Sequence, residues 1–274
     1  MTSTPLFLDT SIQISRRGDD PAEIKKIDDV LKGHDLLATS SFVRLEFKQS
    51  FIQDLAYLHR NLVLERSFAK VLAGVRALHS HPGHIRKASM ILEILGGYFS
   101  NAKSFHSDSK FDSDLAEQLG LYLEIILEDI WEWFNQESVD YVSDATECIR
   151  SRTMPRRKTL VFDVRVEKCK SQKIRCNLNK FFKDKEAQFR AIRDHINTLD
   201  DARKDKPDEL KRIATIIDLG LANPDDLCNS KECRGLGDAL IAVEALHFKE
   251  LFTKDKDQAG VICAAIALKS DLLF

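Results

Sequence analysis

The apolar positions near the start of the chain fall into short runs separated by helical spacing. Residues Pro5–Leu8 form an apolar run that predicts a short strand. Asp20 is a typical N-cap and Gly33 a typical stop, so a helix is expected between them. The run Leu36–Thr39 predicts a second strand, and a serine at 40–41 can begin the next helix. The first 60 residues therefore predict the order β-α-β-α.

The middle of the chain has a different pattern. From about Ala56 to Glu147 the apolar residues recur at helical spacing. Turn-forming residues interrupt this spacing at 81–83, at Gly96–Gly97 and around 104–113. The pattern predicts three or four helices with no strand between them.

A basic stretch follows the helices, and it contains the β-prone run Leu160–Val166. Helical spacing returns over Lys180–Leu199 and again from near Pro207 to Gly220.

The last 45 residues return to an α/β pattern, with a helix over Asp238–His247 and a strand over Glu250–Thr253. We therefore expect a small α/β domain built from both ends of the chain, residues 1–60 plus 207–274. A large, mainly helical insertion of residues 61–206 would end in the basic, cysteine-containing segment.

Composition is that of a globular chain of 274 residues, 43% hydrophobic and 31% charged. The start lacks the basic region of a signal peptide. The longest apolar run, Val261–Leu268, is shorter than the roughly 20 residues that span a bilayer. We expect a cytoplasmic protein without a membrane partner, whose six cysteines are thiols or metal ligands rather than disulfides.

Four acidic residues occupy positions that an α/β sheet could bring together. Asp9 ends the first predicted strand, and Asp255 follows the strand Glu250–Thr253. Glu46 lies in the helix after the second strand, and Asp238 begins a helix. Ligands of open α/β sheets bind beyond the carboxyl ends of the strands, which is where these acids are expected.

Clustered carboxylates repel one another unless a cation neutralises them. Oxygen ligands suit hard cations such as Mg²⁺ or Mn²⁺, and a site holding these ions can hydrolyse phosphodiesters.

Four segments carry these acids, and in order they resemble the successive motifs of PIN-domain nucleases. The segments are FLDTS (7–11), SFVRLE (41–46), GDALIAVEAL (237–246) and LFTKDKD (251–257). This resemblance implies a flavodoxin-like parallel sheet, RNA as the usual substrate, and products with 5′-phosphate and 3′-hydroxyl ends.

The resemblance also implies a role for each motif residue. The catalytic and metal-binding acids would be Asp9, Glu46, Asp238 and Asp255. The supporting residues would be Thr10, Ser11, Thr253 and Asp257. A toxin or antiphage-defence setting is a further implication, with an antitoxin or another protein regulator as partner.

Two further possibilities stay open. Asp9 and Asp255 can instead be ordinary turn or cap residues, with Glu46 in a solvated helix. The heavily apolar helix with Trp131 and Trp133 can belong to the core or to a homo-oligomer or partner interface.

Four cysteines are spaced in two pairs. Six residues separate Cys169 from Cys176, and four separate Cys228 from Cys233. Two such pairs can close a tetrahedral structural zinc site, and the alternative is four independent thiols.

The near-neutral total charge hides two charged blocks. Residues 150–185 contain 13 Lys or Arg against 3 Asp or Glu, whereas residues 108–147 contain 12 acids and one Lys. Such a basic patch suits the phosphate backbone of RNA or single-stranded DNA, although the acidic helix can neutralise it instead. The candidate nucleic-acid-binding residues are Arg156, Arg157, Lys158, Lys168, Lys170, Lys173 and Arg175.

The sequence thus favours a metal-dependent nuclease. The competing hypotheses are a catalytically inactive RNA-binding or assembly module on the same fold, and a helical interaction protein with almost no β structure.

Overall fold

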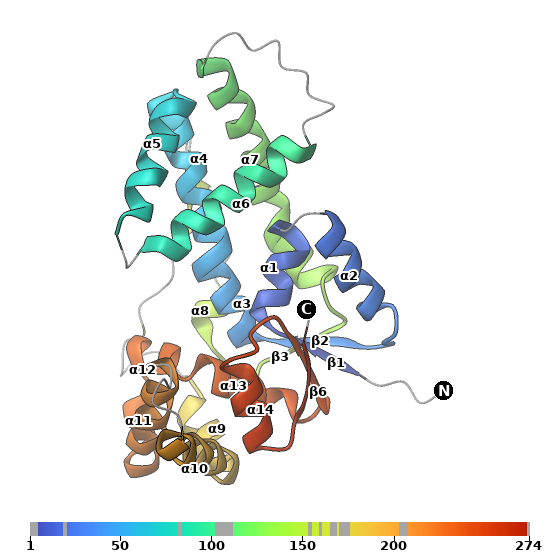
Figure 1. Cartoon of the computed structure of the whole chain (residues 1–274), viewed down its shortest axis with the longest axis vertical. Coiled ribbons are helices and arrows are strands. Elements are labelled where there is room, and N and C mark those ends of the chain that lie inside the picture. Colours follow the sequence, from blue (N-terminus) through green and yellow to red (C-terminus); the bar gives the residue numbers. More distant parts are fainter. Residues whose placement is uncertain are drawn as a thin grey trace.

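The protein folds around a parallel β-sheet with helices on both faces (Figure 1). The computed structural model describes residues 5–18, 21–81, 84–101, 112–152, 155–158, 161–164, 169, 176–202 and 208–272. Five strands form the sheet in the order β3-β2-β1-β6-β7, with every neighbouring pair parallel. They are β1 (Leu6–Leu8), β2 (Leu37–Ser40), β3 (Tyr141–Ser143), β6 (Glu250–Thr253) and β7 (Lys269–Leu272).

Alternate residues of the central strand point to opposite faces of the sheet. Leu6 and Leu8 pack with Ile12 and Ile27 in a small core on one face, whereas Phe7 belongs to the larger core on the other. The helices covering the two faces are α1 (Thr10–Gly18) and α2 (Pro21–Leu31) on the first, and α3 (Ser41–Phe47), α13 (Gly237–Ala245) and α14 (Ala259–Ala265) on the second. Burial on both faces explains why β1 is entirely apolar.

A helical arm extends from the sheet (Figure 1). It consists of α4 (Gln53–Glu65), α5 (Phe68–His79), α6 (Ile85–Asn101) and α7 (Asp112–Gln136). A π-helical turn, η1 (Lys48–Ile52), joins α3 directly to α4. Trp131 and Trp133 are buried, so they belong to the core. None of the described helices is long and apolar enough to cross a membrane.

The rest of the chain forms a second group of helices beside the sheet, with a short hairpin. Helix α10 packs against both α11 and α14. The elements of this part are α8 (Ile149–Arg152), β4 (Arg156–Lys158), β5 (Val161–Asp163), α9 (Leu178–Asp184), α10 (Glu186–Ala202), α11 (Asp208–Ala222), the 3₁₀ turn η4 (Pro224–Leu227) and α12 (Ser230–Gly235).

Most predicted elements at the two chain ends are confirmed. The strands expected at Pro5–Leu8, Leu36–Thr39 and Glu250–Thr253 correspond to β1, β2 and β6. Ser40 caps α3 by accepting a hydrogen bond from the backbone N–H of Val43 at 3.2 Å. The expected N-cap Asp20 and most of the break at 104–113 lie outside the described residues.

The prediction of helices with no strand between them is confirmed for the described part of α4 to α7, but the extension of the helical pattern to Glu147 is wrong. Strand β3 falls there and pairs with β2 at an edge of the sheet. The segment 61–206 therefore contributes to the sheet itself as well as forming the arm.

The break expected at Gly96–Gly97 is also wrong, because α6 runs through both glycines. Surrounding helices hold this segment in shape despite its low helix propensity. A sharp turn that was not predicted lies at Arg66, between α4 and α5, where this residue adopts the left-handed conformation (φ 48°).

A buried carboxyl group lies between α13 and the strands β2 and β3. Glu244 is only 2% exposed, and no described residue gives either of its oxygens a hydrogen bond of normal geometry. Burial raises its pKa from 4.5 to about 8, although the nearby Ser40 hydroxyl opposes this shift.

This carboxyl group should make stability fall as pH rises. The folded protein keeps the Glu244 proton up to about pH 8, whereas the unfolded chain releases it near pH 4.5. The free energy of unfolding should therefore drop by up to about 1.4 kcal/mol per pH unit between those values. Urea unfolding from pH 5 to 8 should show a smaller slope for Glu244→Gln. Glu117→Gln, an exposed control on α7, should keep the wild-type slope, and equal slopes for all three proteins would contradict the argument.

Candidate functional site

The candidate site lies where the order of the strands reverses. The chain leaves β1 for β2 and β3 on one side, then returns to place β6 and β7 on the other. Crevices at such switch points, beyond the carboxyl ends of the strands, are the usual ligand sites of open α/β sheets. Asp9 directly follows β1, and Asp255 follows its neighbour β6 in the sequence.

Asp9 is held by a set of short hydrogen bonds. The backbone N–H of Thr10 donates to Oδ1 at 2.6 Å. The hydroxyls of Ser11 and Thr253 donate to Oδ2 at 2.9 and 2.7 Å. Burial nevertheless raises the pKa of Asp9, because the loss of water outweighs these bonds, and the charge of Asp255 adds to the effect.

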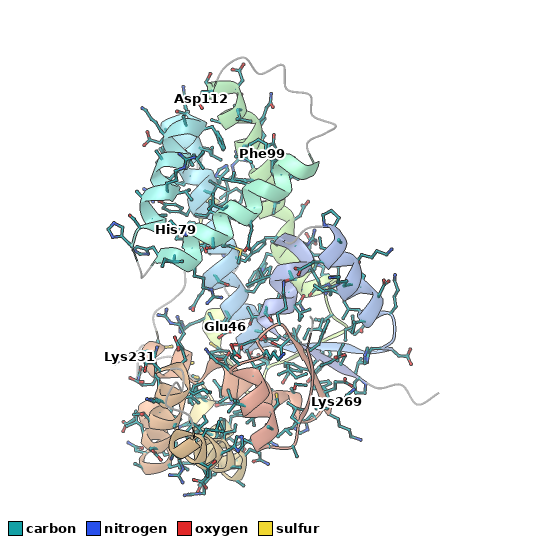
Figure 2. The ribbon with its side chains drawn as sticks, viewed as in Figure 1. Glu46, His79, Phe99, Asp112, Lys231 and Lys269 are labelled. Carbon is teal, nitrogen blue, oxygen red and sulfur yellow. The ribbon has the colours of Figure 1, made fainter. Side chains whose placement is uncertain are left out.

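Glu46 points into the same region from α3, where the helical arm meets the sheet (Figure 2). The Thr10 hydroxyl donates to its Oε2 at 2.7 Å. Burial and the charge of Asp238 raise the pKa of Glu46 to about 8. Thr10 thus connects two of the acids, with its backbone bound to Asp9 and its hydroxyl to Glu46.

Asp238 lies in the first turn of α13, which carries it toward the other acids. Burial raises its pKa to about 7, and the charges of Asp9 and Asp255 add to the shift. The preceding Gly237 permits this approach. A Cβ atom there would lie 2.5 Å from Oε1 of Glu46.

Asp255 has two roles. Its Oδ1 accepts hydrogen bonds from the backbone N–H groups of Asp257 and Gln258 at 3.1 and 2.9 Å, which fixes the turn before α14. It also lines the candidate cavity. The interpretation of Asp255 as a turn residue is therefore correct, and it does not exclude a place in the site.

All four predicted acids line one cavity of about 790 Å³. Thr10 and Ser11 line it as well, whereas Thr253 supports Asp9 through its hydroxyl. Asp257 is exposed and is not among the lining residues. The sequence therefore predicted four of the five acids that line the cavity, from residues more than 240 positions apart, and missed Glu209.

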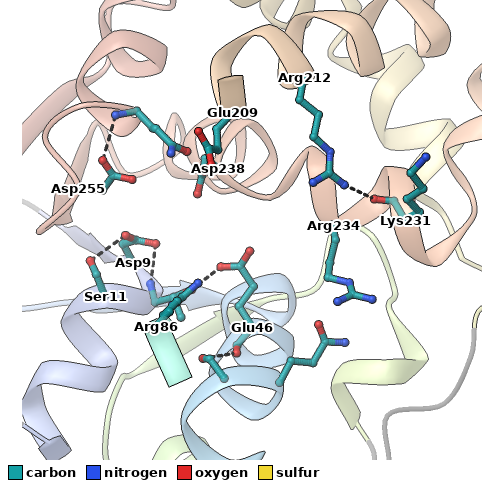
Figure 3. A pocket seen from close by; sticks show the side chains of 14 residues that line it. Asp9, Ser11, Glu46, Arg86, Glu209, Arg212, Lys231, Arg234, Asp238 and Asp255 are labelled. Carbon is teal, nitrogen blue, oxygen red and sulfur yellow. Dashed lines mark hydrogen bonds between the residues drawn. The ribbon is translucent and has the colours of Figure 1, made fainter. Parts of the chain in front are cut away.

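The other half of the cavity is basic, and the sequence analysis missed it. Arg212, Lys231 and Arg234 gather on the side away from Asp9 (Figure 3). Arg86 of the arm lies among the acids, where its charge lowers the pKa values of both Glu46 and Asp238. Glu209, Gln49, Ser50 and Gln258 complete the lining.

No local pattern could have identified these cations. They come from α6, α11 and α12, which no motif connects.

The acids fit a hard cation in their chemistry, because they offer only oxygen and their charges repel one another. They do not form a ready coordination sphere. Within the described ranges, no three His, Cys, Asp or Glu side chains are arranged to hold a metal ion.

The predicted nucleic-acid patch is only partly described. Arg157 of β4 forms ion pairs with Glu124 and Glu128 of α7. For this residue, the acidic helix therefore neutralises the basic patch, which is the alternative left open by the sequence. Arg156 and Lys158 lie on the same strand and do not line the cavity. The other predicted residues of the patch fall outside the described residues, namely Lys168, Lys170, Lys173 and Arg175.

The cysteines expected as two pairs lie near one another, and none forms a disulfide. The thiol of Cys176 donates a hydrogen bond to the backbone carbonyl of Thr146 at 3.7 Å, and the nearby Cys228 sulfur helps to raise the pKa of Cys176. Burial raises the pKa of Cys233, and the nearby Cys148 and Cys169 raise it further.

Comparison with known proteins adds no relative to this description of the site. No known protein family, no curated protein and no solved structure matches the chain.

The tight contact at Gly237 can be tested by substitution. Gly237→Ala should push the Glu46 carboxylate and the ring of Phe42, 3.0 Å from the added carbon, out of place. We expect a loss of about 1–3 kcal/mol in the free energy of unfolding, measured with urea. Gly74→Ala is the matched control, because its Cβ meets open space within α5, and it should gain about 0.5–1 kcal/mol. Wild-type stability of Gly237→Ala would show that the contact is not constrained.

Proposed function

We propose that this protein is a metal-dependent nuclease of the PIN type that hydrolyses phosphodiester bonds in RNA, with single-stranded DNA as the second candidate. One observation carries the proposal. Four acids from the two ends of the chain and a set of cations from three other helices line a single cavity at the switch point of a parallel sheet. Hydrolysis of a phosphodiester would use both halves of the cavity, the cations to bind the charged phosphate and the acids to hold the metal ion.

The basic half supplies the binding. Arg212, Lys231 and Arg234 are exposed at the cavity, where they can contact the phosphates beside the bond that is cut. Arg86 brings a positive charge among the acids, so a phosphate reaching them is not simply repelled.

The acidic half supplies the chemistry. Asp9, Glu46, Asp238 and Asp255 would hold Mg²⁺ or Mn²⁺. When bound, such an ion lowers the pKa of a coordinated water and offsets the charge of the phosphate.

Without an ion, burial and neighbouring acids raise the pKa values of Asp238 and Glu46 to about 7 and 8, so a bound divalent cation would stabilise both carboxylates in their ionised form. Water forms the new bond to phosphorus, a carboxylate accepts its proton, and the departing sugar oxygen takes up a proton.

The sheet supports this proposal against one competitor. A five-stranded parallel sheet is incompatible with a purely helical interaction protein whose ends only imitate PIN motifs. A toxin or antiphage-defence role with a protein regulator remains part of the proposal.

The second candidate is a non-catalytic RNA-binding module on the same fold. It is favoured by the finding that the described acids are not already gathered into a metal site. Both candidates use the basic half of the cavity, so cleavage separates them and binding does not.

The first prediction from this proposal concerns cleavage. Purified wild-type protein should cut labelled single-stranded RNA in Mn²⁺ and not in EDTA. Asp238→Asn should reduce the rate at least about 100-fold, since it removes a charge at the reacting centre. Asp257→Asn is the matched control, because this exposed acid lies outside the cavity, and it should cut at the wild-type rate.

Three results would contradict this prediction. Cutting of DNA in preference to RNA would change the substrate. Equal cleavage by wild type and Asp238→Asn would indicate a contaminating nuclease. RNA binding with no cutting in any divalent metal would favour the non-catalytic module.

The second prediction compares a cation of the cavity, Arg86, with a cation of the β4 hairpin, Arg156. Arg86→Ala should weaken RNA binding about three- to tenfold in fluorescence anisotropy and reduce its salt dependence by about one phosphate contact. Arg156→Ala removes the same charge outside the cavity and should bind like wild type. The opposite ranking would place the RNA on the β4 hairpin, as the sequence alone suggested.

A further inference from the structure

Three cations share one wall of the candidate cavity. Lys231 and Arg234 are three positions apart on α12, so they lie on the same side of that helix. Arg212 reaches them from α11, which packs against α12 (Figure 3). Two packed helices therefore present three positive charges to the same space.

The guanidinium of Arg212 is held in place by the backbone of α12. One of its N–H groups donates to the carbonyl oxygen of Lys231 at 3.4 Å. Gly235 permits the close approach, because a Cβ atom there would lie 3.1 Å from Nε of Arg212. A guanidinium has five N–H donors, and among the described residues Arg212 uses one of them in this bond. The other donors of this positioned group can bind an anion.

The cavity offers no ring on which a base could stack. Its described lining consists only of charged side chains, hydroxyls and side-chain amides. Bases of single strands bind mainly by stacking on aromatic side chains, whereas phosphates bind Arg and Lys. The part of a nucleic acid that fits this cavity is therefore its sugar–phosphate backbone.

The volume of the cavity limits how much of a strand it can hold. About 790 Å³ is within the range of pockets that enclose one drug-sized molecule, and a nucleotide is of that size. The end of a strand fits such a space better than a long internal stretch does.

The number of cations also suits the end of a strand. An internal phosphate carries one negative charge and has two oxygens outside the chain. A terminal phosphomonoester carries about 1.5 to 2 negative charges at neutral pH and has three such oxygens. Three cationic groups on one wall can each meet one of these oxygens.

We propose that Arg212, Lys231 and Arg234 bind the phosphomonoester at one end of a nucleic-acid strand. Helix α12 ends at Gly235, and α13, which carries Asp238, begins at Gly237. The bound end is thereby fixed a short distance from the acids, which then face a phosphodiester close to that end. The inference rests on the proposed nucleic-acid substrate but not on its cleavage.

The test is binding in EDTA, where the proposed nuclease does not cut. Three short single-stranded RNAs with an internal fluorophore carry a 5′-phosphate, a 3′-phosphate or hydroxyls at both ends. In fluorescence anisotropy, one of the two phosphorylated RNAs should bind wild-type protein about tenfold more tightly than the hydroxyl-ended RNA. The two phosphorylated RNAs thus decide which end is bound.

Variants show whether this preference comes from the wall. Arg212→Ala should bring the affinities for phosphorylated and hydroxyl-ended RNA to within about twofold of each other, because it removes the positioned guanidinium. Lys211→Ala is the matched control, since this exposed residue of α11 does not line the cavity, and it should keep the wild-type preference. Arg212→Lys keeps the charge without the planar fork and should keep only part of the preference.

Two results would overturn the inference. Equal affinity of wild-type protein for all three RNAs would reject it without relying on any variant. A full preference in Arg212→Ala would place the terminal phosphate elsewhere. The proposed nuclease activity fails separately, because a protein that never cuts can still prefer a phosphorylated end, and a protein that cuts can lack this preference.

Discussion

The burial of several carboxyl groups close together at the end of the sheet is the constraint on which this structure depends. Burial is the largest cause of the raised pKa values of Asp9, Glu46 and Asp238, and the charges of neighbouring acids add to it. Hydroxyl donors from Thr10, Ser11 and Thr253 offset only part of this cost. A protein without a use for these acids would gain stability by replacing them, so their arrangement is best understood as a site.

The acidic half of the site could be predicted from the sequence because each acid has a local signature. Asp9 ends an apolar strand and Asp238 begins an apolar helix, and both positions can be recognised within a few residues. The basic half could not, because Arg86 and Arg212 are ordinary surface residues of their helices. They become neighbours of the acids only because α6 packs against α4 and α5 and α11 packs against α10 and α12, and such packing has no short-range pattern.

The errors in the fold have the same origin. Strand β3 is three residues long and lies at a sheet edge, so its identity as a strand comes from its partner β2 rather than from its own sequence. Gly96–Gly97 suggests a break, yet α6 continues because it is packed against α4 and α5. Local propensity was overridden by tertiary contacts in both cases. The basic charge near β4 is a separate matter, because Arg157 pairs with acids of α7 while the nucleic-acid role of the segment stays a prediction.

The continuous helix that starts at the sheet gives the arm a mechanical connection to the site. Helix α3, the π-turn η1 and α4 form one rod of about 25 residues, roughly 37 Å long, from Ser41 to Glu65. Glu46 lies near its base, one residue before the end of α3. Because Glu46 and the arm share one continuous helix, a change in how α4 packs against α7 would also displace the Glu46 carboxylate. The arm therefore helps to set the position of one acid of the cavity.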